Sequence, residues 1–357
     1  MEFPDYTYIS MEDPDVQLWA KDDPRGFLEQ NDKYVIIDEI QRVPDLFSYL
    51  QTHTDGSGIT GQYIISGSQS FLLSEKISQS LAGRAVILNL LPFSLYELSE
   101  KIHRSMGLDD FLFRGFFPRI YDKNINPVDF YPSYIQAYIE RDVRQIKNVT
   151  NLYDFNRFLK LCAGRTGQLL NLTSLANDCG ISVNTAKAWI SVLEQSFIIF
   201  LLKPYYRNFN KRTVKMPKLY FYDTGLICSL LGLEDKKQLM THYLRGSLFE
   251  NFIILEILKS RFNNGRSSNL YFWRNNHGNE IDCVVEKPDN LYAIEIKSGR
   301  TFSSDFFRGI NYWNKIAGSI SGRSFVVYGG KTNRKTPAGE LISWENTKDL
   351  IHTINAF

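Results

Sequence analysis

Two groups of acidic side chains stand where predicted strands end. Asp38 and Glu39 follow the apolar run 34–37, and an aspartate at such a strand end can hold magnesium while the next carboxylate orients or deprotonates a water molecule. The second group comprises Asp282, Glu295 and Lys297, spaced D-x(12)-E-x-K. Two carboxylates with a lysine can bind a divalent cation and steady the charge that develops on a phosphate.

The second group lies on a predicted hairpin, EIDCVV-EKPDN-LYAIEIK. If the turn centres on Pro288 and Asp289, residues whose numbers add to 577 are cross-strand partners, which pairs Asp282 with Glu295. Directly opposed residues have Cβ atoms about 5 Å apart. Lys297, two residues further on, shares the face of Glu295. The alternative is a cross-strand salt bridge on a solvated sheet face.

The elements that position the first group follow a β-α-β order. Residues 34–38 (YVIID) and 62–66 (QYIIS) are short β-branched runs typical of buried parallel strands, and residues 44–52 have helical periodicity. This order implies a parallel sheet with a right-handed crossover. We also predict a helix over 72–80 and a third strand over 85–90.

Several further motifs accompany Asp38 and Glu39. Ser66 and Ser68 in ISGSQ are placed to sense a γ-phosphate, and Arg84 in SLAGR can reach the phosphates of a neighbouring subunit. The ordered set IIDEIQRVP, ISGSQ, SLAGR and LLPFSLYEL resembles prokaryotic AAA+-type ATPases with a C-terminal domain of unknown function. That resemblance covers nearly the whole chain and implies ATP, magnesium and a homo-oligomer formed through the AAA+ domain.

A phosphate-binding loop, G-x-x-x-x-G-K-S/T, would precede the strand YTYIS in that family, and we expect this chain to begin after it. Gly330-Lys331-Thr332 does not replace the loop because position 325 is Phe. We therefore expect the chain as given to bind ATP poorly.

The middle of the chain predicts a helix-turn-helix, LTSLANDCGISVNTAKAWISVLEQ (172–195), with Ser182 capping the second helix. Two strands joined by the basic loop YRNFNKRTVKMP follow and suggest a winged version. Residues 141–218 hold 13 Lys and Arg against 4 Asp and Glu, whereas residues 1–140 hold 11 against 21. DNA contacts are therefore expected at Lys187, Arg207, Lys211 and Arg212, with a protein-protein module as the alternative.

The final α/β unit begins with the predicted helix LFENFIILEILKSRF. Glu250 on this helix, with Asp282, Glu295 and Lys297, resembles the core of PD-(D/E)xK nucleases. The resemblance implies a restriction-endonuclease-like fold and a magnesium or manganese site formed by Glu250, Asp282 and Glu295, with Lys297 catalytic.

Bulk properties exclude a membrane span, since the longest apolar runs are far shorter than about 20 residues. The N-terminal residues lack the features of a secretory signal, so we expect a cytoplasmic protein. Four separated cysteines predict reduced thiols in the core.

The sequence thus predicts an α/β chain with a partial P-loop AAA+ domain (1–130), a helical and winged-helix region (131–245) and a nuclease-like domain (246–357). The expected function is that of an ATPase-like protein coupled to a DNA-directed, nuclease-like module. The alternative is a non-catalytic DNA-binding or assembly protein that retains the nuclease fold without its activity.

Overall fold

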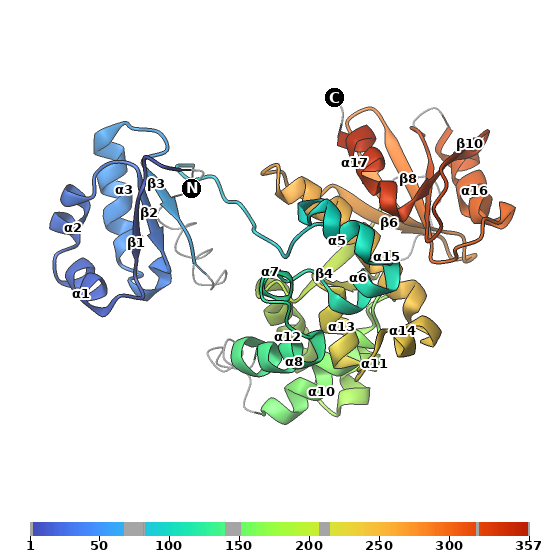
Figure 1. Cartoon of the computed structure of the whole chain (residues 1–357), viewed down its shortest axis with the longest axis horizontal. Coiled ribbons are helices and arrows are strands. Elements are labelled where there is room, and N and C mark those ends of the chain that lie inside the picture. Colours follow the sequence, from blue (N-terminus) through green and yellow to red (C-terminus); the bar gives the residue numbers. More distant parts are fainter. Residues whose placement is uncertain are drawn as a thin grey trace. The chain divides into compact units, whose positions relative to one another are not determined.

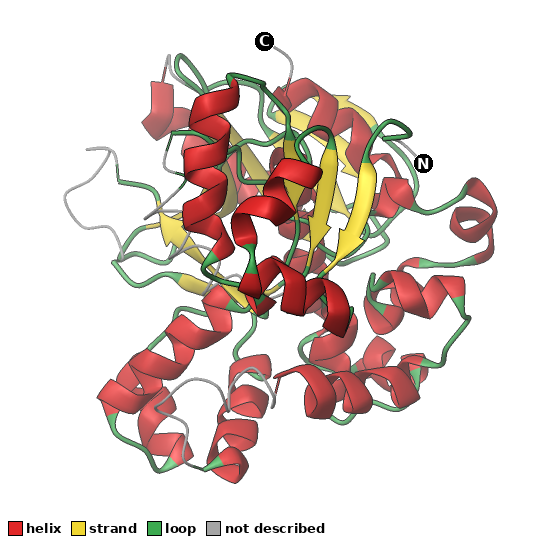
Figure 2. Ribbon diagram, turned by 90° about the vertical axis from the view of Figure 1, so that its left-hand side faces the viewer, coloured by secondary structure: helices red, strands yellow, loops and turns green. Residues whose placement is uncertain are grey.

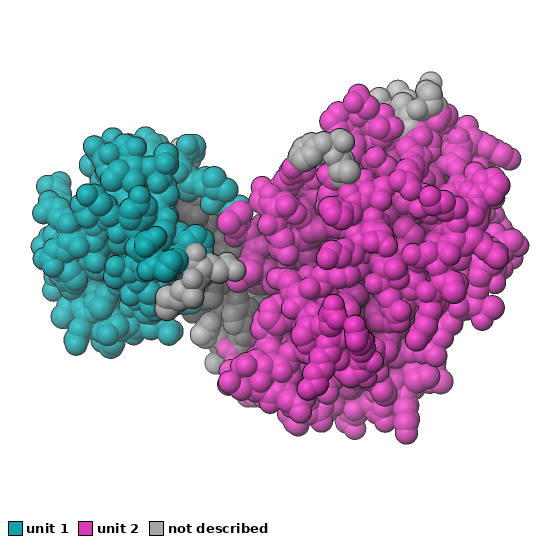
Figure 3. Space-filling model, turned by 45° about the horizontal axis from the view of Figure 1, so that its top comes forward, with its two compact units in different colours: residues 1–87 teal, residues 88–357 magenta. Residues whose placement is uncertain are grey.

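The computed structural model describes residues 3–67, 81, 83–139, 151–206, 215–318 and 321–355. It divides the chain into two compact units, residues 1–87 and 88–357, coloured teal and magenta in Figure 3. Both units combine helices with strands (Figure 2). The boundary between these units, after residue 87, comes earlier in the chain than the domain boundary at 130 predicted from the sequence.

The first unit is built on a parallel sheet with strand order β1-β2-β3 (Figure 1). Its register places Ser10 beside Asp38, so the carboxyl ends of β1 and β2 meet at one edge. The elements are β1 (Thr7–Ser10), α1 (Pro14–Asp22), α2 (Pro24–Gln30), β2 (Val35–Asp38), α3 (Leu46–Ser57) and β3 (Tyr63–Ile65). The predicted β-α-β order is confirmed.

The predicted third strand at residues 85–90 is wrong. These residues have no regular structure, and Val86, Leu88 and Leu90 are 84%, 69% and 95% exposed. β-branched composition favours a strand only where a neighbour supplies hydrogen bonds, and no described strand pairs with this segment. The predicted helix at 72–80 lies outside the described residues.

The second unit contains an eight-stranded mixed sheet with the order β10-β11-β9-β8-β7-β6-β4-β5. The strands are β4 (Ile199–Pro204), β5 (Lys218–Phe221), β6 (Leu270–Arg274), β7 (Glu280–Glu286), β8 (Leu291–Lys297), β9 (Phe325–Tyr328), β10 (Arg334–Thr336) and β11 (Gly339–Ser343). The helices are α5 (Glu100–Ser105), α6 (Leu108–Arg114), α7 (Pro118–Asp122), α8 (Pro127–Tyr134), α10 (Leu152–Ala163), α11 (Leu172–Cys179), α12 (Val183–Gln195), α13 (Thr224–Leu230), α14 (Lys236–Thr241), α15 (Arg245–Phe262), α16 (Arg308–Ala317) and α17 (Thr347–Asn355).

Residues alternate between the two faces of this sheet. Cys283 and Ile294 pack in the core cluster that contains α15 and α17, whereas Val284 and Ala293 pack in the cluster that contains α16. The four cysteines are buried free thiols, as expected. No helix of the described chain combines the length and apolar character that crossing a bilayer requires.

The predicted helix-turn-helix elements are present. Ser182 accepts a hydrogen bond from the Thr185 amide at the start of α12, and Gly180 ends α11 with φ of 71°. The strands after it are not a separate wing, because β4 pairs with β5 and also with β6, which joins them to the eight-stranded sheet.

Helix α15 is buried along most of its length and carries polar groups into the core. Lys259 and Glu256 are each 1% exposed and form an ion pair of 3.1 Å. The Lys259 ammonium also donates to the Phe93 carbonyl oxygen at 2.6 Å, while Glu256 accepts from the Leu95 amide at 2.8 Å. These bonds fix the segment LLPFSLYEL against the helix.

Replacing Lys259 with Met leaves Glu256 buried without its counter-charge. We expect the free energy of unfolding of the second unit to fall by about 3–5 kcal/mol, measured by urea denaturation. The double variant Lys259→Met/Glu256→Gln should recover part of this loss, and exposed Lys237→Met is the matched control. Equal stability of Lys259→Met and Lys237→Met would contradict the stabilising role of the Lys259–Glu256 ion pair.

Candidate functional sites

The first site lies at the carboxyl edge of the parallel sheet, where ligands of open α/β sheets commonly bind. The Asp38 carboxylate accepts hydrogen bonds from the Ser66 hydroxyl and, at 2.6 Å, from the Tyr8 hydroxyl. These two bonds, that of Ser66 first, hold the pKa of Asp38 below its usual value. The carboxylate is therefore ionised and fixed, as a magnesium ligand must be.

Glu39 has a left-handed backbone, with φ of 55°, and its carboxylate accepts from the Gln41 side chain. The two acidic side chains have different partners, since Asp38 binds Ser66 and Tyr8 whereas Glu39 binds Gln41. Tyr8 was missed in the sequence. Its position two residues before the end of the neighbouring strand was the only available signal.

Two other predicted members of this site have different outcomes. Arg84 forms a bidentate ion pair with Asp55 on α3, with distances of 2.6 and 2.9 Å, so its guanidinium is bound within its own unit. Ser68 lies outside the described residues.

The second site is centred on the hairpin of β7 and β8. Cys283 pairs with Ile294 and Glu286 with Leu291, so the predicted register is confirmed for this ladder. The ladder ends at the Cys283–Ile294 pair, so the predicted pair of Asp282 with Glu295 is not part of it. The Asp282 carboxylate accepts from the Ile296 amide at 2.7 Å.

A β-bulge explains the orientation of Asp282. Between the pairs Tyr271–Val284 and Trp273–Ile281, two residues of β7 oppose one residue of β6. Asp282 and Cys283 are those two residues, and such a bulge re-aims a side chain.

Glu295 lies against α16. A Cβ atom added to Gly309 would lie 3.1 Å from Glu295 Oε2, which has no hydrogen-bond partner among the described residues. Its other oxygen accepts from Lys297 Nζ at 2.5 Å. Burial, and then the charge of Asp282, raises the pKa of Glu295 to about 8, although Lys297 opposes the rise.

Glu250 projects from α15, which covers the opposite face of the sheet. Its Oε1 accepts from Lys218 Nζ at 2.8 Å and from the Tyr220 hydroxyl. Burial raises the pKa of Glu250 to about 7, with Lys218 opposing and Asp282 adding to the rise.

Lys218 is the central cation of this cluster, and the sequence patterns did not predict its place there. Its side chain is 4% exposed, and it forms ion pairs with Glu250 and Glu280. Burial acts to lower its pKa, but the carboxylates of Glu250, Asp282 and Glu280 outweigh burial and raise it. The sequence did contain one indication of this cluster. Lys218 and Tyr220 are two residues apart, as are Glu280 and Asp282, and residues two apart on a strand share a face.

This arrangement does not fit a divalent cation held by Glu250, Asp282 and Glu295. Glu250 is turned to Lys218, and Glu295 lies against α16. Within the described ranges, no group of three or more His, Cys, Asp or Glu side chains is arranged to hold a metal ion. In the described residues, these carboxylates are instead paired with Lys218 and Lys297.

The predicted nucleic-acid contacts are placed only in part. Lys187 is exposed on α12. Arg207, Lys211 and Arg212 fall outside the described residues.

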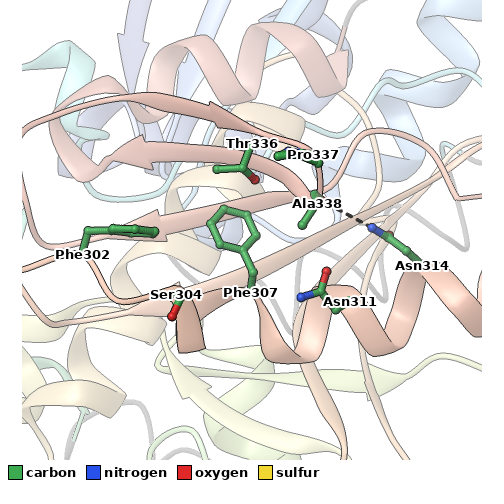
Figure 4. A pocket seen from close by; sticks show the side chains of 8 residues that line it. All are labelled: Phe302, Ser304, Phe307, Asn311, Asn314, Thr336, Pro337 and Ala338. Atoms are coloured by element: carbon green, nitrogen blue, oxygen red, sulfur yellow. Dashed lines mark hydrogen bonds between the residues drawn. The ribbon is translucent and has the colours of Figure 1, made fainter.

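Figure 4 shows a surface pocket of about 390 Å³ on the α16 side of the second unit. Asn314 donates to the Ala338 carbonyl oxygen at 3.1 Å across it. The pocket contains none of the predicted site residues. Its lining is Phe302, Ser304, Phe307, Asn311, Asn314, Thr336, Pro337 and Ala338.

A parallel sheet with a fixed aspartate at one strand end and a serine at the next is compatible with an AAA-type domain. Comparison with known proteins points the same way. Residues 2–99 match a family described as an AAA domain. Residues 106–237 and 245–346 match two domains of unknown function, DUF8612 and DUF4143. These matches support an AAA-type ATPase-like protein that carries domains of unknown function.

Several relatives that match most of the chain are described as uncharacterized proteins. One from Mycobacterium tuberculosis is 29% identical over 338 residues, 92% of this chain and 74% of that protein, and one from Mycobacterium bovis has the same values. One from Methanocaldococcus jannaschii is 25% identical, covering 79% of this chain and 66% of its own. The crystal structure of VC1899 from Vibrio cholerae covers 90% of this chain and 89% of its own at 13% identity, with a TM-score of only 0.22.

The hydrogen bonds to Asp38 can be tested by titration. Ser66→Ala and Tyr8→Phe should each raise the pKa of Asp38 toward its ordinary value, because each removes a bond to the ionised form. NMR detection of the Asp38 carboxyl carbon gives the measurement. Tyr153→Phe in the second unit is the control, and an unchanged pKa in both site variants would contradict the described geometry.

Proposed function

We propose that the chain is an AAA-type ATPase-like protein in which the carboxyl edge of the first sheet binds magnesium-nucleotide, but only weakly, because Asp38 reaches phosphate only through the metal. The hydrogen-bonded Asp38–Ser66 pair supports this proposal best, because it joins an ionised carboxylate to a hydroxyl from the neighbouring strand end. Magnesium, when bound, would neutralise phosphate charge. Asp38 would hold it, Ser66 would orient Asp38, and Glu39 would orient the attacking water.

Differential scanning fluorimetry tests this proposal. Magnesium-ATP at about ten times its Kd stabilises the first unit by about 1.4 kcal/mol and should raise its melting temperature by about 6–10 °C, whereas ATP with EDTA should not. Asp38→Asn should abolish the rise because the carboxylate charge is lost, while Asp45→Asn is the matched control. No rise in the wild type, or equal rises in wild type and Asp38→Asn, would refute the proposed site.

A second proposal is that the middle of the chain contacts DNA without using the nuclease-like cluster for cleavage. Its support is the exposed position of Lys187 near the start of α12, together with the basic balance of residues 141–218. In helix-turn-helix proteins, the start of the second helix approaches the major groove. The β7–β8 cluster then serves the fold.

Salt titration of duplex DNA binding tests this second proposal. Log affinity should fall linearly with log salt, and Lys187→Ala should weaken binding and make the slope shallower by about 1. Exposed Lys160→Ala on α10 is the control. A salt-independent affinity, or identical slopes for the wild type and Lys187→Ala, would favour a protein-protein module.

A further inference from the structure

Lys218 places a buried ammonium between two carboxylates of the acidic cluster. It extends from the first residue of the edge strand β5 and contacts one carboxylate from α15 and another from the start of β7. Its ammonium lies 2.8 Å from Glu250 Oε1 and 5.6 Å from the centre of the Phe272 ring. The buried ammonium therefore joins three separate elements.

The carboxylates of Glu250, Glu280 and Asp282 each have a partner within the described chain. Tyr220 donates a further hydrogen bond to Glu250, Arg274 pairs with Glu280 at 3.2 Å, and the Ile296 amide binds Asp282. A divalent cation needs open carboxylate oxygens at about 2.0–2.6 Å. Binding one beside Lys218 would place two positive centres on the same oxygen atoms in a poorly solvated site, where their repulsion is strong.

We propose that Lys218 is a built-in cation that replaces a divalent metal, so that the cluster of Glu250, Glu280 and Asp282 is complete without magnesium or manganese. Because Lys218 pairs with these carboxylates, the chain can carry a nuclease-like motif while its described residues form no three-carboxylate metal group. Removing its charge should uncover a metal site that the wild type lacks. The inference does not depend on the proposed nucleotide site.

The experiment uses the full chain with Asp38→Asn, so that the first unit cannot supply the response. Manganese binding is measured by electron paramagnetic resonance and by thermal shift. The Asp38→Asn protein should bind no manganese at 1 mM. Adding Lys218→Met should lower the melting temperature without metal by about 10 °C, because the partly buried carboxylates of Glu250 and Glu280 lose the ammonium they share. Manganese should then restore at least half of that loss.

Two further variants separate metal binding from general damage. Lys218→Met/Glu250→Gln should regain stability without metal and lose the manganese rescue, because it removes a carboxylate together with the ammonium. Lys218→Arg, which keeps the charge, should show no metal rescue.

Stoichiometric manganese binding by the Asp38→Asn protein would overturn the proposal directly, even if Lys218→Met failed to fold. Lys218→Met that folds but gains no metal response would also overturn it. Because neither readout uses ATP, failure of the proposed nucleotide site would leave these results interpretable.

Discussion

The second unit depends on satisfying the polar groups that α15 carries into the core. A buried charge or amide without a partner costs more than most single contacts contribute. Asn251 meets this requirement by bonding both the amide and the carbonyl of Phe221, each at 2.8 Å. Glu256 and Lys259 hold Phe93 and Leu95, so one helix fixes β5 on one side and the chain segment before α5 on another.

The acidic cluster meets the same requirement for a polar partner near the first turns of α15. Glu250 needs a partner at the margin of the core, and β5 supplies Lys218 and Tyr220. Since Asn251 has already fixed β5 by its backbone, these two side chains reach Glu250 with little remaining freedom. The neutralised cluster is therefore coupled to the packing of the core.

Local sequence patterns predicted the strands around Asp38, the capped helix after Ser182 and the register of the β7–β8 hairpin. Each of these features depends on neighbours in the chain or on one turn. The sequence could not place Lys218 in the acidic cluster, because that contact joins an edge strand to residues about 30 and 60 positions later. It also misassigned residues 85–90, whose apolar pattern lacks a described partner strand.

The bulge at Asp282 and Cys283 has a consequence for how linear motifs are interpreted. Spacing such as D-x(12)-E-x-K counts residues along one hairpin, but the direction of its aspartate is also set by the next strand, β6, on the other side. Two chains with identical spacing can therefore present that carboxylate to different faces if only one has the extra residue. The spacing therefore predicts which residues are close on the hairpin. Which side chains meet at one site also depends on how the hairpin pairs with the neighbouring strand.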